Sequence, residues 1–124
     1  MAMKQANAAQ KKWMSDIVDW SINNIGMLYT SKYDGAIPQL HHVLGRSAKQ
    51  NKIAIGHWFI LPVPFELHDV SSDHPLNVTH NKKAFTAMYG MQRVLFDSMY
   101  YSMMNQGYTV PINEINLAIQ ETNA

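Results

Sequence analysis

The spacing of apolar residues changes twice along this chain of 124 residues, and this change limits the possible fold more than any other feature. Apolar side chains recur every three or four positions in residues 11–27 and 91–105, as in an amphipathic helix. Residues 39–44 and 53–63 instead carry short runs of β-branched, aromatic and other apolar side chains, which favours two strands that pair across a long loop. The sequence therefore predicts a small α+β fold.

Prolines and glycines mark where the other expected elements begin and end. Pro64 opens a short helix over residues 64–68, because proline suits the first helical turn. Another helix begins near His80 and is interrupted at Gly90, before the helix over 91–105. Pro111 opens a last helix.

The start of the first helix sets the expected domain boundary. Residues 1–10 are rich in Ala, Gln and Asn without apolar periodicity, and we expect a flexible N-terminus there. Gly26 suits the C-terminal cap of the helix over 11–27. Because 47% of the chain is hydrophobic, residues 11–124 are expected to form a single domain with one core.

Composition excludes several classes of protein. No apolar run approaches the roughly 18 residues of a membrane span, and the start of the chain lacks the apolar stretch of a signal peptide. We therefore expect no membrane partner and a cytoplasmic location. The absence of cysteine excludes disulfides, thiolate zinc sites and cysteine nucleophiles. Any metal ion would have to be bound by Asp, Glu or the six histidines.

The charge of the chain is nearly balanced, but its middle is locally basic. A formal net charge of +1 argues against a polycation that coats nucleic acid. Five cations in the middle of the chain are candidate contacts to phosphate: Arg46, Lys49, Lys52, Lys82 and Lys83. The two adjacent lysines follow His80, where the dipole at a helix N-terminus would also attract phosphate. The alternative is a solvated surface without a partner.

Four histidines form a candidate metal centre. His41 and His42 are adjacent on the expected strand over 39–44, so their side chains point to opposite faces and cannot serve the same purpose. His68 lies on the short helix after the second strand, and His80 begins the next helix. Neutral imidazoles from a strand and a helix can bind a divalent cation and leave a position open for water or substrate. The alternative is scattered surface or core histidines, because this spacing is less specific than a close His-x-x-x-His pair.

Three short segments together resemble a known family. They are His41-His42-Val43-Leu44-Gly45, then Ile60-Leu61-Pro62-Val63-Pro64-Phe65-Glu66-Leu67-His68, and then His80 with Phe85 and Tyr89-Gly90. In this order they resemble the nuclease core of the phage recombination-enhancement (Ref) proteins, which are RecA-dependent members of the HNH endonuclease superfamily. The resemblance spans residues 25–104.

The resemblance implies a fold, an activity and a set of site residues. The fold would be a strand-strand-helix core of the ββα-metal, treble-clef-like HNH type with flanking helices. The activity would be metal-dependent hydrolysis of DNA phosphodiesters in the cytoplasm of a bacterial host, with recombination intermediates and a RecA-type recombinase filament as expected partners. His41 and His68 would bind one divalent ion (Zn, Mg, Mn or Ni), and His80 would be a third ligand or would support the ligands. His42 would be the catalytic general base that activates water.

The chain also departs from the family pattern. Related proteins often carry two Cys-x-x-Cys pairs for a structural zinc, and the matching positions here hold Met27, Thr30, Pro64 and Leu67. Phe59 stands nearest to the central Asn of the HNH pattern, and His57, two residues earlier, is expected to be a half-buried, hydrogen-bonded residue. Two alternatives therefore stay open. One is a catalytically weak DNA-binding or recombinase-interacting module that keeps the shape of the metal site, and the other is a structural metal protein without a nucleic-acid role.

Overall fold

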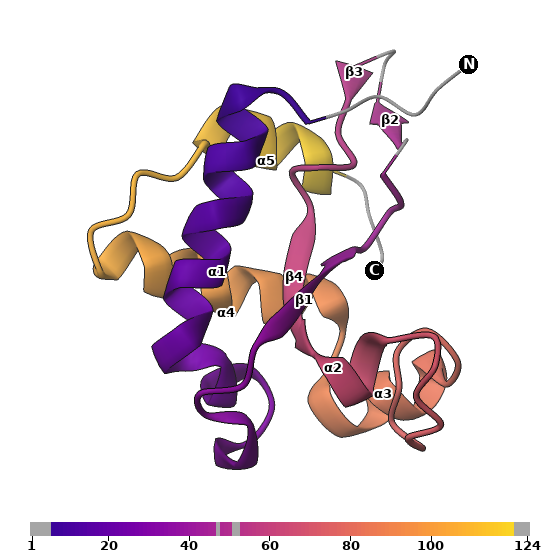
Figure 1. Ribbon diagram of the computed structural model, residues 1–124. Helices are drawn as coiled ribbons and strands as arrows, with labels where there is room; N and C mark the ends of the chain where they lie inside the picture. The colour runs from indigo at the N-terminus through magenta and orange to yellow at the C-terminus, as the bar shows by residue number, and fades with distance from the viewer. Residues whose placement is uncertain (1–5, 47, 51–52, 121–124) are drawn as a thin grey trace.

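Helices surround a short antiparallel sheet in the computed structural model, which describes residues 6–46, 48–50 and 53–120 (Figure 1). The elements in chain order are α1 (Ala8–Leu28), the 3-10 turn η1 (Ser31–Tyr33), β1 (Pro38–His42), β2 (Lys49–Gln50), β3 (Ile53–Ala54), β4 (Ile60–Pro64), α2 (Phe65–His68), α3 (Lys82–Tyr89), α4 (Gln92–Asn105) and α5 (Ile112–Ile119). The predicted α+β class is confirmed. No helix in the described ranges is long and apolar enough to cross a membrane.

The main sheet consists of β1 and β4, which are separated in sequence by a long loop. Pro38 lies opposite Pro64, and His42 lies opposite Ile60. The predicted pairing of two strands across a loop is therefore confirmed. Each strand of a two-stranded sheet is an edge strand, and this explains why β4 tolerates prolines, which cannot donate to a ladder. Within the loop, β2 and β3 pair with each other in a second small ladder.

A turn interrupts the second strand that the sequence predicts over residues 53–63. The Trp58 amide donates to the Ile55 carbonyl at 2.9 Å, which closes the turn. A Cβ on Gly56 would lie 2.3 Å from the carbonyl oxygens of both Gly45 and Arg46. The turn can therefore pack against the backbone that follows β1 only because residue 56 is glycine, and β4 begins after it.

Helix α1 begins earlier than the sequence predicts. Asn7 and Gln10 form a capping box, in which the Gln10 amide donates to Asn7 Oδ1 at 2.8 Å and the Asn7 amide donates to Gln10 Oε1 at 2.9 Å. The helix therefore includes Ala8, which lies within the segment expected to be flexible (residues 1–10). Residues 1–5 of that segment lie outside the described part of the chain.

Gly26, which the sequence predicts as the C-terminal cap of α1, is not the cap. Gly26 lies within α1, which continues to Leu28. A Cβ on Gly26 would lie 1.9 Å from Asp34 Oδ1. The absence of a side chain at Gly26 therefore lets Asp34, just after η1, pack closely against α1. The sequence around Gly26 does not predict this contact.

The core lies where α1, β4 and α4 meet. All five residues of β4 are buried, whereas all five of β1 are half-buried. Two hydrogen bonds fix this packing. Trp13 Nε1 on α1 donates to the Trp58 carbonyl at 3.1 Å, and Oη of Tyr29, the C-cap of α1, donates to the Pro62 carbonyl at 2.7 Å. Phe59 packs against Phe96 of α4 with ring centroids 5.0 Å apart. This arrangement leaves β1 as the strand whose side chains can reach solvent.

Helix α2 directly follows β4 and packs against both strands (Figure 1). The next helix, α3, begins at Lys82, two residues after His80, and Gly90 separates it from α4 as the sequence predicts. Thr79, whose hydroxyl donates to the His68 carbonyl at 2.5 Å, ties the preceding loop to α2. The order β1, β4, α2 thus places His41 and His68 on neighbouring elements.

Candidate functional site

The adjacent histidines of β1 have different contacts, as the strand geometry predicts. His41 Nε2 lies 2.8 Å from Gln92 Oε1, and the His41 ring centroid lies 5.0 Å from that of His68. His42 Nε2 lies 3.0 Å from Nδ1 of His57. The doublet therefore belongs to two separate groups, which we name the His41–His68 pair and the His42–His57 pair.

Amide side chains orient both rings of the His41–His68 pair. Gln39, two residues before His41 and hence on the same face of β1, accepts a hydrogen bond from His68 Nδ1 at 2.6 Å. The Gln39 amide is itself fixed, because its Nε2 donates to Asp69 Oδ1 at 2.8 Å. Since an amide oxygen only accepts, His68 carries its hydrogen on Nδ1 and keeps a lone pair on Nε2. By the same reasoning Gln92, which is 2% exposed, leaves the lone pair of His41 on Nδ1.

The surroundings of the His41–His68 pair keep both rings neutral. Burial lowers the pKa of His41 to about 4, and the nearby His68 and Lys82 add to this effect against the opposing hydrogen bond to Gln92. Burial also lowers the pKa of His68. Both rings are therefore neutral at pH 7, and neutral imidazole is the form that binds metal ions.

His42 is likewise a neutral base at pH 7. Burial, together with the neighbouring His57 and Arg46, lowers its pKa to about 4. A histidine in water has a pKa of about 6.5, so the structure changes the pH range in which His42 can accept a proton.

Two of the predicted phosphate contacts lie beside the histidines. Arg46 is near enough to His42 to lower its pKa, and Lys82 has the same effect on His41. Both cations are exposed. Lys49 on β2 and Lys83 on α3 are also exposed, and Lys52 lies outside the described residues.

His80 does not join the two pairs in this structure. Its side chain is exposed, and its Nε2 donates to the Val70 carbonyl at 2.8 Å. Within residues 6–46, 48–50 and 53–120, no three His, Asp or Glu side chains lie close enough together to hold a metal ion. Of the predicted ligands, the structure thus brings together His41 and His68.

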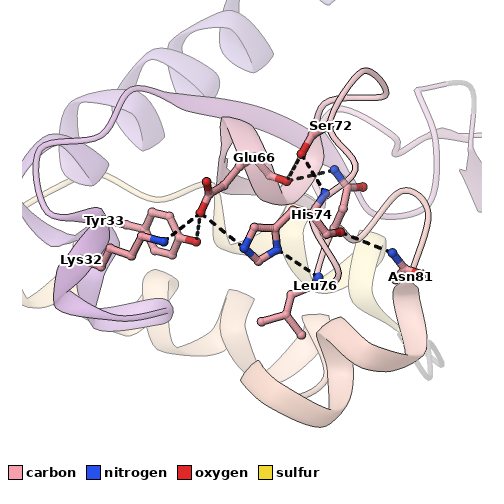
Figure 2. A network of polar contacts seen from close by, with 8 residues as sticks. Lys32, Tyr33, Glu66, Ser72, His74, Leu76 and Asn81 are labelled. Carbon is pink, nitrogen blue, oxygen red and sulfur yellow. Dashed lines mark hydrogen bonds and ion pairs between the residues drawn. The ribbon is translucent and has the colours of Figure 1, made fainter.

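A polar network holds the loop between α2 and α3 (Figure 2). Glu66 Oε1 accepts a hydrogen bond from Tyr33 Oη at 2.5 Å and lies 3.6 Å from His74 Nε2. The Glu66 carbonyl accepts from Ser72 Oγ at 2.7 Å, and His74 Nδ1 accepts from the Leu76 amide at 3.0 Å. His74 therefore stabilises the loop that connects His68 to α3.

Sequence reasoning missed the residues that orient the histidines. Gln39 could have been found, because position i−2 on a strand shares a face with His41. Gln92 could not, because only the packing of α4 on the sheet brings it to β1. His57 is hydrogen-bonded as expected but is buried rather than half-buried, and its partner, the predicted base His42, was not foreseen.

Comparisons of the chain with known protein families, with curated proteins and with solved structures give no match. The function proposed below therefore depends on the residues of this chain and on the resemblance described above.

Proposed function

We propose that this chain is a metal-dependent endonuclease of the HNH type that hydrolyses phosphodiester bonds in DNA. The observation that carries the proposal is the division of the histidine doublet between a two-histidine pair and a separate neutral base. Phosphodiester hydrolysis needs both parts, because one set of groups must bind a cation and another must take a proton from water. The order β1, β4, α2 also agrees with the strand-strand-helix core that the resemblance implies.

The His41–His68 pair fits a divalent ion that keeps water or phosphate oxygens among its ligands. Both rings are neutral at pH 7, and glutamine side chains occupy one nitrogen of each ring while the other keeps its lone pair. Partners of this kind orient histidine ligands in metal sites. Imidazole suits Zn or Ni better than Mg or Mn, which prefer oxygen. When bound, the ion would neutralise negative charge on the phosphate. His80 as a third ligand stays a prediction from the resemblance.

The other residues of the site bind the substrate and move a proton. Arg46 and Lys82 would bind phosphate oxygens on either side of the doublet. His42 would accept the proton of a water molecule as the water oxygen bonds to phosphorus and the bond from phosphorus to the leaving oxygen breaks. Because its pKa is lowered to about 4, His42 is unprotonated and able to act at any pH above about 5.

The test is cleavage of single-stranded, duplex and recombinase-coated DNA in the presence of Mn, Ni, Zn or Mg. We expect the parent protein to cleave at least one of these substrates. The variant His42→Ala should lose about two to four orders of magnitude in rate, the usual contribution of a positioned general base, and should keep its metal content and DNA affinity.

Lys11→Gln, an exposed change on α1, is the matched control and should cleave like the parent. An absence of cleavage under every condition would overturn the proposal. If DNA binding remained in that case, the catalytically weak DNA-binding module would be the better description.

A further inference from the structure

The His42–His57 pair contains a buried histidine to which the proposed function assigns no role. His57 is 9% exposed, and its Nδ1 lies 3.0 Å from His42 Nε2. The two rings are nearly perpendicular, with an interplanar angle of 79° and centroids 5.0 Å apart. His42 itself is half-buried at the end of β1.

The backbone around His57 is fixed on both sides. The preceding residue, Gly56, lies so close to the backbone after β1 that a Cβ there would be 2.3 Å from the Gly45 carbonyl oxygen. The carbonyl of the following residue, Trp58, accepts a hydrogen bond from Trp13 Nε1 at 3.1 Å. The backbone that carries the His57 ring therefore has a defined position relative to β1, as an orienting group requires.

The contact between the two rings allows two arrangements of hydrogen. If His42 Nε2 donates to His57 Nδ1, the lone pair of His42 lies on its Nδ1, which can accept a proton from water. If His57 Nδ1 donates instead, Nδ1 of His42 already carries hydrogen and cannot act as a base. In the first arrangement, His57 holds the ring by the contact at Nε2 without occupying Nδ1, the nitrogen that the proposed function needs.

We propose that His57 is a positioning residue that accepts a hydrogen bond from His42 Nε2 and thereby keeps His42 in the tautomer with an unprotonated Nδ1. The catalytic part of this inference rests on the proposed function, since it takes His42 as the base. The proton from water then moves to Nδ1 of His42, while the hydrogen on Nε2 stays in place and its bond to His57 orients the resulting imidazolium ion.

Two substitutions of nearly equal size separate this role from packing. His57→Asn keeps an acceptor near the place of Nδ1, whereas His57→Leu has the shape of the Asn variant without the acceptor. The first measurement is the ¹⁵N shifts of the His42 ring nitrogens in metal-free protein at pH 7. We expect hydrogen on Nε2 in the parent and in His57→Asn, and a mixture of both tautomers in His57→Leu.

The second measurement is steady-state cleavage of DNA. His57→Leu should lower kcat by about ten- to hundredfold with KM unchanged, and His57→Asn should restore most of the activity. Hydrogen on Nδ1 of His42 in the parent would overturn the proposal. A lower metal content in both variants would also overturn it, since the pair would then be a metal site.

The two proposals can fail separately. The expected tautomers in a parent protein that cleaves no DNA would support the role of His57 and overturn the proposed function. If His57→Leu does not fold, the parent and His57→Asn still decide the question by the hydrogen position on His42.

Discussion

The adjacent residues His41 and His42 of β1 have different side-chain partners. His41 shares a face with Gln39 and meets His68 and Gln92, whereas His42 meets His57. Strand geometry alone requires this division, because successive side chains point to opposite faces. Substitutions at the two adjacent positions should therefore affect different properties.

Burial of His41 should make the stability of the protein depend on pH. Its pKa is about 4 in the folded state and about 6.5 in the unfolded chain, so the unfolded chain binds more protons between these values. The free energy of unfolding should fall as the pH is lowered from 6.5 towards 4, by at most about 3 kcal/mol from this residue. Urea unfolding at several pH values measures the effect.

The variant His41→Gln cannot take up this proton. Its free energy of unfolding should therefore vary less between pH 7 and pH 4.5 than that of the parent. An equal variation in the two proteins would show that another group causes the acid sensitivity.

The helices and strands that were predicted correctly are those marked by patterns of neighbouring residues in the sequence. The period of the apolar residues predicted α1 and α4, and the short apolar runs predicted β1 and β4 as a pair. Proline and glycine signals placed the start of α2 and the break at Gly90. Two errors, the cap expected at Gly26 and the unbroken strand expected through Gly56, arise because a segment from elsewhere in the chain lies close to each glycine. The division of the doublet was likewise predicted from the strand, while Gln92 and His57 depend on tertiary packing.

The turn before β4 provides a test at the level of elements. Gly56→Ala would place a Cβ against backbone carbonyl oxygens, which cannot move as a flexible side chain can. We expect it to lower the free energy of unfolding by about 1–3 kcal/mol, the usual cost of overpacking. It should also lower the cleavage rate, since the turn carries His57.

Gly26→Ala is the matched control. Its Cβ would meet the carboxylate of Asp34, a side chain that can rotate away, and would lie 3.2 Å from Ser31 Cα, while alanine favours the helix by about 0.5–1 kcal/mol. We expect little net change in its unfolding by urea. A larger decrease in stability for Gly26→Ala than for Gly56→Ala would contradict this account of the turn.

Across the whole molecule, exposed cations lie on both sides of the half-buried strand. Arg46 follows β1 and Lys82 begins α3, and each lowers the pKa of one member of the doublet. The net charge of the chain is only +1, so any attraction to DNA must come from such local placement.

The double variant Arg46→Gln, Lys82→Gln should therefore bind all DNA sequences more weakly. The slope of log affinity against log salt should become less steep by about 0.7 to 0.9 for each phosphate that the variant no longer neutralises, because fewer counterions are released. Titration of labelled DNA at several salt concentrations measures the slope. Lys11→Gln should leave it unchanged, and a double variant with the slope of that control would show that both cations are only solvated.

The different burial of the two paired strands also bears on how such a site can evolve. Every residue of β4 is buried, so packing restricts which side chains it can carry. Every residue of β1 is half-buried, and its side chains meet polar partners from three other segments. Mutations in β1 can therefore exchange the proposed ligand or the proposed base while β4 preserves the fold, so that the chemistry of such a site can change without a new core.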